Sequence, residues 1–306
     1  MARLFLRRLP DSLLLIGGVL TLVFLTMFVV GDPARAMLPP ETPYEEYLAF
    51  RRAMGFDDPI PVQYLRFIGG VVRGDFGQSW WERTPALPIA LRPLPATLLL
   101  AVFSLAVAVS TGLPLGVLAS RHPGSALDRL AILISLSGVT MPIIWLGLIM
   151  ILVFAVGLRW LPTSGYGTWA HVVLPGLTLA ALPMGRIAQI SRVSMIDELA
   201  KQYVVTATAK GLPGRAVLFR HALRNAAIPI LTVAGWELVL MLGGYTIVVE
   251  TVFGWPGVGL QLFTAIEHRD MPVIAATVFV ISVVIVAVNF LVDLLYGAID
   301  PRVQYQ

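Results

Sequence analysis

Three acidic residues lie within or beside long apolar stretches, where a carboxylate could act on a buried substrate. Glu237 is central in its stretch, Glu250 lies at the end of the same stretch, and Asp293 lies near the end of the last one. An intramembrane hydrolase needs paired acids or a nucleophile at one depth, and neither G-x-S-x-G nor H-E-x-x-H occurs. Because the three depths differ, we predict no catalytic residue and a protein that is not an enzyme.

The cationic and metal-ligating residues indicate no cofactor held by this chain. The two lysines, Lys201 and Lys210, lie outside any G-x-x-x-x-G-K-[ST] pattern, so the chain carries no nucleotide-binding P-loop. Cysteine is absent, and the four histidines lack the i, i+4 spacing of a helical zinc site. We therefore expect neither a metal site nor a bound cofactor.

The composition indicates a polytopic membrane protein. Of 306 residues, 57% are hydrophobic and 13% are charged, against about 25% charged residues in soluble domains. The mean hydropathy is +0.82. The net charge of +4 is too small and too scattered for nucleic-acid binding.

Six stretches with few or no charges are long enough to cross a bilayer, which takes about 20 helical residues. They lie between residues 11–32, 92–121, 129–159, 171–192 (interrupted by Arg186), 225–249 (interrupted by Glu237) and 270–293. We therefore predict an all-α polytopic protein with six transmembrane helices.

The first of these stretches could instead be a cleaved signal peptide. It begins with basic residues and is followed by Ala34-Arg35-Ala36, a small-residue pattern that a signal peptidase could cut. Its apolar run exceeds the roughly 7–15 residues usual in signal peptides. We therefore expect it to be retained as a membrane anchor.

The distribution of Lys and Arg predicts the orientation, because these residues accumulate in cytoplasmic loops. With the amino terminus inside, the inside segments carry 12 of them, whereas the two short outside loops carry only Arg159 and Arg269. Both termini are therefore predicted to be cytoplasmic. This divides the chain into a tail and first helix (1–32), an extracytoplasmic segment of short helices (33–92) and a five-helix core (93–306) with a cytoplasmic loop at about 192–225.

The cytoplasmic loop carries the signals of a helix about a dozen residues long. Ser194 followed by Asp197 matches a helix-start pattern. At the other end, Lys210 suits the helix dipole, Gly211 can adopt the left-handed cap, and Pro213 prevents continuation.

This predicted helix has one small apolar face. Leu199, Tyr203 and Ala207 recur at i, i+4 and i+8, and a short apolar strip of this kind can dock in the groove of a partner protein. The alternative is a solvated loop held near anionic lipid by its basic residues.

The residues of this loop resemble those of a known family. Tyr203–Gly211, followed by Arg220–Asn225 and Pro229, is similar to the cytoplasmic "EAA" loop of ABC importer permeases, and most similar to the dipeptide/oligopeptide branch. Four further stretches agree with that branch along the whole chain: Gly31–Ala34, Asp58–Tyr64, Glu250–Gly259 and the end of the chain with Asp293 and Asp300-Pro301-Arg302. The glutamate that names the EAA motif is replaced here by Val205.

The resemblance implies a permease subunit of a type I importer, in a bacterial inner membrane. Its implied partners are a homologous second permease, two ABC ATPases that use ATP and Mg, and an extracytoplasmic substrate-binding protein. It also implies that Tyr203, Ala207, Lys210, Gly211 and Arg215 belong to the helix that couples the permease to an ATPase. Di- or oligopeptides are the implied substrate, while nickel chelates, glutathione and sugars stay open.

Glu237 is the candidate residue for the translocation pathway. A carboxylate in the middle of a span costs about 2.5 kcal/mol or more in lipid. Glu237 should therefore line a pathway, pair with a polar group of another subunit, or be protonated. Arg186 lies nearer the inner end of its predicted span, where its side chain could snorkel to the surface. Asp293 and Asn289, one turn apart, could bond to a neighbouring helix.

Two glycine-containing patterns concern packing. Gly112 and Gly116 form a small-xxx-small step that favours close helix contact over a bend at Pro114. Gly254–Gly259 predicts a tight turn at the outer interface with Trp255 as an amphipathic anchor.

A secondary transporter or channel that works alone is the main competing hypothesis. It predicts more ionisable residues in mid-membrane and broken helices in matched halves. Glu237 fits the first criterion, and no matched pair fits the second. A purely structural membrane anchor is a third possibility, disfavoured by Glu237 and by the ordered cytoplasmic helix.

Overall fold

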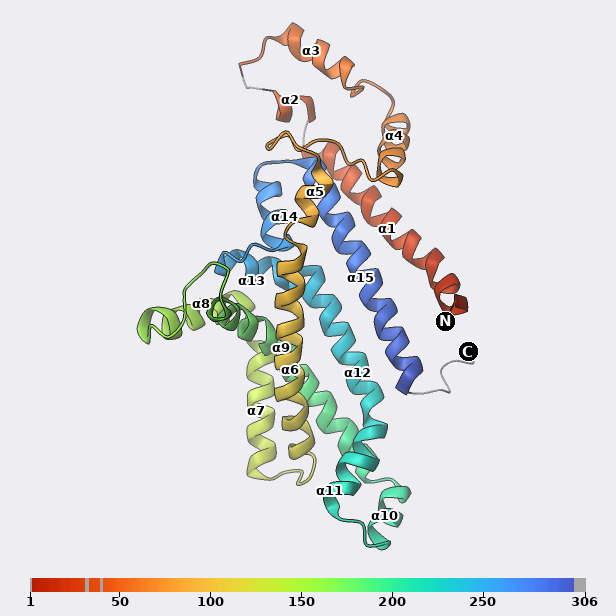
Figure 1. Ribbon diagram of the computed structural model, residues 1–306, viewed down its shortest axis with the longest axis vertical. Coiled ribbons are helices and arrows are strands. Elements are labelled where there is room, and N and C mark those ends of the chain that lie inside the picture. Colours follow the sequence, from red (N-terminus) through yellow and green to blue (C-terminus); the bar gives the residue numbers. More distant parts are fainter. Residues whose placement is uncertain (1, 31–32, 39–40, 300–306) are drawn as a thin grey trace. The chain divides into compact units, whose positions relative to one another are not determined.

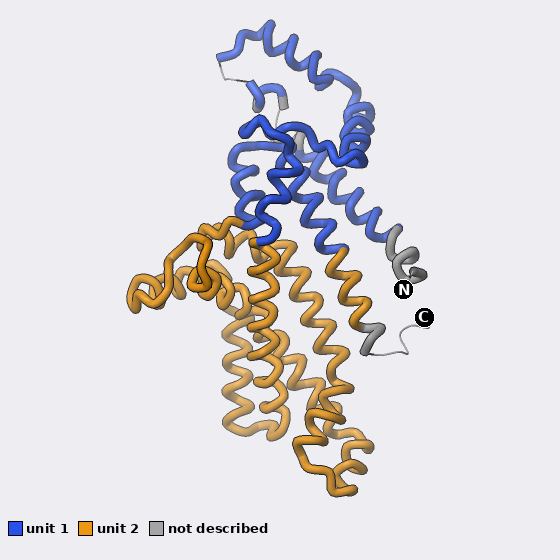
Figure 2. Tube along the Cα trace, in the orientation of Figure 1, with its two compact units in different colours: residues 1–95, 257–286 blue, residues 96–256, 287–306 orange. Residues whose placement is uncertain are grey.

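The computed structural model describes residues 2–30, 33–38 and 41–299 of the chain. In these ranges the protein is built from helices, and the β structure is a single isolated bridge between Gln78 and Pro85 (Figure 1). The predicted all-α class is confirmed. Two compact units divide the chain: residues 1–95 with 257–286, and residues 96–256 with 287–306 (Figure 2).

The first unit contains one long amino-terminal helix and several short ones. Its elements are α1 (Ala2–Val30), α2 (Pro33–Met37), α3 (Tyr44–Ala53), α4 (Ile60–Val72), α5 (Ala86–Leu91), α14 (Val258–Glu267) and the first part of α15 (Met271–Ile299). Its core gathers Leu20, Phe76, Ala90, Ala265 and Val273 with their apolar neighbours. The expectation of short helices in residues 33–92 is confirmed.

The Asp58–Tyr64 stretch forms the beginning of α4 and fastens it locally. Pro59 precedes α4, where a missing N–H costs nothing. The Gln63 amide donates to the Asp58 carbonyl at 2.8 Å, and the Tyr64 hydroxyl lies 2.7 Å from Thr21 Oγ1 on α1. Two parts of the motifs quoted above, Gly31-Asp32 after α1 and Asp300-Pro301-Arg302 near the carboxyl end, lie outside the described ranges.

The second unit holds a helical bundle centred on α9 (Trp169–Leu199). Around it lie α6 (Leu94–Ala119), α7 (Ala126–Thr140), α8 (Ile143–Met150) with the π-helical η1 (Ile151–Gly157), and α12 (Leu223–Leu240). The helix α12 continues through η3 (Met241–Tyr245) into α13 (Thr246–Phe253). Both α7 and α12 pack along α9.

Glycines allow α9 to approach its neighbours closely. A Cβ on Gly112 of α6 would lie 2.6 Å from the Met184 carbonyl oxygen, and one on Gly116 would collide with the Ala188 carbonyl oxygen. A Cβ on Gly138 of α7 would lie 2.5 Å from the Ala181 carbonyl oxygen. The predicted close packing at the small-xxx-small step is confirmed, and its partner is α9.

The third predicted span is bent rather than straight. α7 and α8 meet at an angle of 105°, where Met141 is extended (φ −77°, ψ 124°) and Pro142 precedes α8. Proline disfavours helical conformation in the residue before it and lacks an N–H for the helix ladder. The expectation of one uninterrupted helix over residues 129–159 was wrong for this reason.

Within the described ranges, four helices are long and apolar enough to cross a membrane. They are Ala86–Ala119, Trp169–Leu199, Gly214–Phe253 and Met271–Leu295, and the bent pair Ala126–Gly157 makes a fifth if it counts as one span. The described apolar part of the first predicted span, Pro10–Thr26, is shorter. The fold therefore supports four or five spans directly.

Trp255 is buried rather than anchored at an interface. Its side chain is 0% exposed, its Nε1–H donates to the Ala96 carbonyl at 3.0 Å, and its ring meets Tyr166 edge to face. Gly254 before it has φ +57°, which confirms the predicted tight turn. The amphipathic-anchor expectation was wrong because the turn directs the indole into the core against Ala96. The next residue, Thr97, donates its hydroxyl to Glu250 at 2.7 Å.

We expect Trp255→Ala to lower the free energy of unfolding by about 3–5 kcal/mol, the range for removing a large buried aromatic side chain. Trp255→Phe keeps most of the apolar volume and loses the indole N–H, so about 1–3 kcal/mol is expected from the unpaired carbonyl. Thermal unfolding in detergent measures both. The exposed Trp169→Ala is the matched control, and equal losses at both positions would contradict burial of Trp255.

Candidate functional site

The helix predicted after Ser194 is two helices with a joint between them. α9 continues through Ser194 to Leu199, and α10 runs from Gln202 to Ala209. The helix-start pattern at Ser194 was therefore misleading, because it lies inside a helix that is already formed and that buries Met195. The predicted end is confirmed, since Gly211 follows α10 with φ +77°.

A polar cluster closes the joint between α9 and α10. Lys201 Nζ lies 2.5 Å from Glu198 Oε1, and the Tyr203 hydroxyl donates to Glu198 Oε2 at 2.6 Å. The hydrogen bond to Glu198 raises the pKa of Lys201, and burial followed by the bond to Glu198 raises the pKa of Tyr203. At neutral pH the cluster is thus an ammonium and a neutral phenol on one carboxylate. We call these three residues the joint cluster.

The apolar side of α10 faces its own chain. Val204 and Ala207 are buried against Val217, with Leu199 and Tyr203 packed beside them. The opposite side is exposed: Val205 is 58% exposed, and Lys210, Gly211, Leu212 and Arg215 are also exposed. The structure therefore divides the predicted coupling residues into an inward pair, Tyr203 and Ala207, and an outward group, Lys210, Gly211 and Arg215.

An ion pair that we did not predict joins the start of α7 to α9. Arg192 donates to both oxygens of Asp128, with Nη2 at 2.8 Å from Oδ2, and Asp128 is 2% exposed. Gly124 N–H also donates to Asp128 at 2.8 Å, and Ser125 Oγ accepts from the Asp128 N–H. The sequence shows a Ser-x-x-Asp helix start from Ser125 to Asp128, but it does not show that Arg192 on α9 is the partner of Asp128.

We expect Asp128→Asn to destabilise the protein by about 3 kcal/mol, because it leaves a half-buried guanidinium without its carboxylate. Thermal unfolding of the purified chain measures this. The same substitution at the exposed Asp197 is the control and should change stability by less than about 0.5 kcal/mol. Equal effects at the two positions would contradict a structural role for the Asp128–Arg192 pair.

A second ion pair lies in the interior of the bundle. Arg186 Nη1 donates to Glu237 Oε1 at 2.7 Å, joining α9 to α12. Glu237 is 0% exposed, whereas the Arg186 side chain is 37% exposed, and Tyr245 from η3 also interacts with the guanidinium. We call these three residues the intramembrane cluster.

The pair changes the interpretation of both charges. Because α9 extends to Leu199, Arg186 lies near its middle, on the order of 20 Å from either end at about 1.5 Å per residue. Glu237 balances the charge of Arg186 inside the bundle, whereas the expected snorkelling toward the inner end of the span concerns the exposed part of the side chain. Glu237 is inaccessible from outside the chain in this conformation, and its second oxygen, Oε2, finds no hydrogen-bond partner among the described residues.

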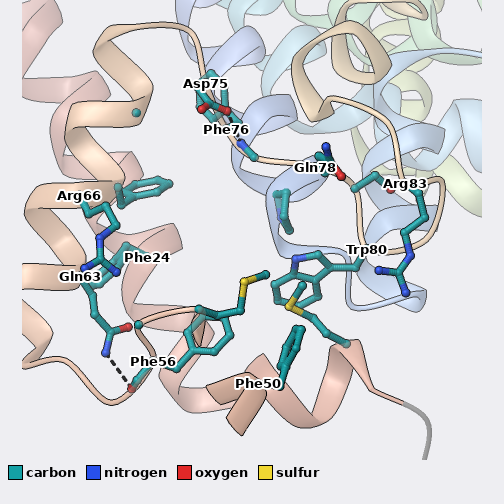
Figure 3. Close-up of a pocket in the computed structure, with 18 residues that line it drawn as sticks. Phe24, Phe50, Phe56, Gln63, Arg66, Asp75, Phe76, Gln78, Trp80 and Arg83 are labelled. Atoms are coloured by element: carbon teal, nitrogen blue, oxygen red, sulfur yellow. Dashed lines mark hydrogen bonds between the residues drawn. The ribbon is translucent and has the colours of Figure 1, made fainter. Parts of the chain in front are cut away.

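A cavity of about 480 Å³ occupies the first unit and is lined mainly by residues of the segment predicted to be extracytoplasmic, together with Phe24 and Pro272. Figure 3 shows its aromatic lining and the two arginines at its edges. Arg66 is held by Asp58 at 2.6 Å, while Arg83 has a left-handed backbone with φ +58°. The described residues include no group of three or more His, Asp or Glu that could hold a metal ion.

Comparison with known proteins matches the whole architecture to one family. The model of the "binding-protein-dependent transport system inner membrane component" matches residues 112–305, and the N-terminal model of the same transport systems matches residues 1–101. This chain belongs to that family. It is an ABC importer permease and a multi-pass inner-membrane protein, and permeases of this family are not enzymes.

Several similar curated proteins are permeases named for glutathione transport. The permease is 41% identical to the glutathione transport system permease protein GsiC of Escherichia coli (strain K12) over 294 residues, covering 96% of this chain and 95% of GsiC. It is 39% identical to GsiC of Pectobacterium atrosepticum over 308 residues, covering both chains completely.

A solved structure supports the fold. A chain of the methionine ABC transporter MetNI in an inward-facing conformation aligns with a TM-score of 0.58 at 20% identity, covering 69% of the permease and 96% of that chain. At this identity the likeness concerns the fold alone.

Proposed function

We propose that this permease forms half of the translocation pathway of an ATP-driven importer of short peptides. Glutathione, itself a tripeptide, is the first candidate substrate because the relatives that match nearly the full chain carry that name. The permease crosses the membrane six times with both termini in the cytoplasm. The distribution of Lys and Arg supports this orientation.

The observation that carries the coupling role is the two-sided structure of α10. Its inner side, with Tyr203 and Ala207, is fastened to α9 and η2 (Val217–Ala222) by apolar contacts and the joint cluster. Its outer side, with Lys210, Gly211 and Arg215, is open for an ATPase groove. A helix held in this way passes a pull on its outer side directly to α9.

The remaining parts of the importer lie on other chains. We propose a homologous second permease, two ABC ATPases that bind ATP and Mg, and an extracytoplasmic binding protein, in a bacterial inner membrane. The absence of a P-loop pattern in the sequence supports hydrolysis by separate subunits.

Affinity purification from native membranes, with mass spectrometry of the bound proteins, tests this assembly. Two P-loop ATPases and a second permease are expected. The complex is then reconstituted in liposomes with its binding protein and supplied with glutathione, dipeptides, nickel chelates and sugars. ATP-dependent uptake of glutathione or dipeptides supports the proposal. Uptake of nickel chelates or sugars instead shows that the proposed peptide substrate is wrong. Uptake by the lone chain without ATP indicates a secondary transporter.

A further inference from the structure

Arg186 combines a position within a predicted membrane span, residues 171–192, with a partly exposed charge. Its side chain is 37% exposed while its partner Glu237 is fully buried. An arginine that faces hydrocarbon at the centre of a span costs about 2.5 kcal/mol or more by insertion scales, and the cost falls toward the ends of the span. The exposed side of the guanidinium therefore faces water or another protein surface rather than lipid.

The charge balance favours water over a permanent protein partner. Arg186 and Glu237 already neutralise each other within one chain. A carboxylate supplied permanently by the second permease would leave a net negative charge inside the membrane, which is unfavourable. A mobile ligand avoids this cost because it carries a positive charge that balances its own carboxylate, and because it leaves the membrane interior again.

The surroundings of Arg186 leave room for such a ligand. Tyr245, which interacts with Arg186, ends the π-helical segment η3, and π-helical turns are frequent at functional sites. Gly243 in the same segment is exposed, and a Cβ on Gly244 would meet nothing within 4 Å. The helix thus presents open backbone next to the tyrosine.

We propose that Arg186 binds the carboxylate of the transported molecule, with Glu237 as the residue that positions it. This inference rests on the proposed importer function and names its substrate class as carboxylate-bearing molecules. Glu237 binds Nη1 of the guanidinium and Tyr245 lies beside it, so the remaining N–H donors are available for the ligand. Its negative charge also weakens anion binding, which suits a pathway that must release what it binds.

Cysteine labelling tests the proposal without knowledge of the natural substrate. The chain has no cysteine, so Leu182→Cys and Gln189→Cys each place a single thiol one helical turn from Arg186. Both positions are partly exposed. In the complete reconstituted complex, these thiols are labelled with the anionic sulfonatoethyl and the cationic trimethylammonioethyl methanethiosulfonates.

For each thiol we compare the labelling rate of the anionic reagent with that of the cationic reagent. We expect this ratio to be about tenfold higher with Arg186 and Glu237 present than in the Arg186→Gln/Glu237→Gln background. That double variant removes both charges together and leaves no unpaired ion. Dialanine should slow the anionic reaction, whereas dialanine amide, which lacks the carboxylate, should not. Glu237→Gln alone should increase the preference for the anionic reagent. If Glu237 had a purely structural role, the substitution would change the labelling rates of both reagents equally.

Two results would overturn the proposal. If the thiols react in the isolated chain but not in the complex, another subunit covers Arg186. If they react in the complex without a charge preference or without protection by dialanine, Arg186 does not bind carboxylates. ATP-dependent uptake by the same preparation shows that the importer function stands in either case, so the two failures are distinguishable.

Discussion

Gly116→Val is expected to prevent stable folding of the permease. The glycine lies where α6 crosses α9, and a Cβ there would collide with the Ala188 carbonyl oxygen and lie 2.7 Å from Ser191 Cβ. Backbone atoms cannot rotate away, so the helices must separate along a contact that includes Gly112 and Met184. Overpacking typically costs about 1–3 kcal/mol, and we expect Gly116→Val to reach or exceed the upper end.

Size-exclusion profiles and thermal unfolding in detergent measure this effect. Gly116→Ala, which adds only the Cβ, should lie between the wild type and Gly116→Val. Gly18→Ala makes the same change in the apolar helix α1, where a Cβ meets nothing within 4 Å, and it should leave the unfolding temperature unchanged. A fully stable Gly116→Val would show that α6 and α9 are farther apart than described.

Gly211→Asn is expected to reduce ATP-driven uptake by about tenfold or more without unfolding the permease. Asparagine tolerates the left-handed backbone better than other side chains, and the φ of +77° can therefore be kept. A Cβ at this position meets nothing within the chain, so folding has no steric reason to fail. The new side chain instead projects from the outer side of α10, where we propose that the ATPase docks.

Gly124→Asn is a matched control for this variant. Gly124 has φ +82°, and a Cβ there also meets nothing within 4 Å, but it lies in the loop between α6 and α7, outside α10. Uptake, ATPase co-purification and unfolding temperature are compared for the two variants. Equal uptake by Gly211→Asn and wild type would contradict docking at this surface, whereas equal losses at Gly124 and Gly211 would indicate a general effect of loop geometry.

The coupling proposal also explains why the charged groups of the joint cluster lie where they do. Glu198 is at the end of α9 and binds Lys201 and Tyr203, which open α10. A pull on α10 therefore reaches α9 through two polar contacts as well as through the buried Ala207 and Val217. The long helix α9 continues from this joint to the intramembrane cluster at Arg186, so one rigid element connects the proposed ATPase surface and the proposed ligand site.

The sequence by itself determined the features that depend on local chemistry. Hydropathy was sufficient to predict the helical class and most of the apolar spans. In lipid, all backbone N–H and C=O groups must be hydrogen-bonded within the chain, so a spanning segment appears in the sequence as a long apolar helix. Gly211 was readable as a left-handed cap and Gly254–Gly259 as a tight turn, since few other residues adopt a left-handed backbone. The motifs around α10 and after α13 were sufficient for the family, which the comparison confirms.

Only the tertiary structure decided which polar residues meet. Arg186 and Glu237 are 51 residues apart, and Asp128 and Arg192 are 64 apart, so no local pattern connects them. The burial of Trp255 was equally unreadable, because an apolar side chain that faces lipid and one that faces protein look the same in a hydropathy pattern. The physical reason is that pairing and burial depend on how helices pack, and packing depends on distant residues such as Gly112 and Gly116 that bring α6 and α9 together.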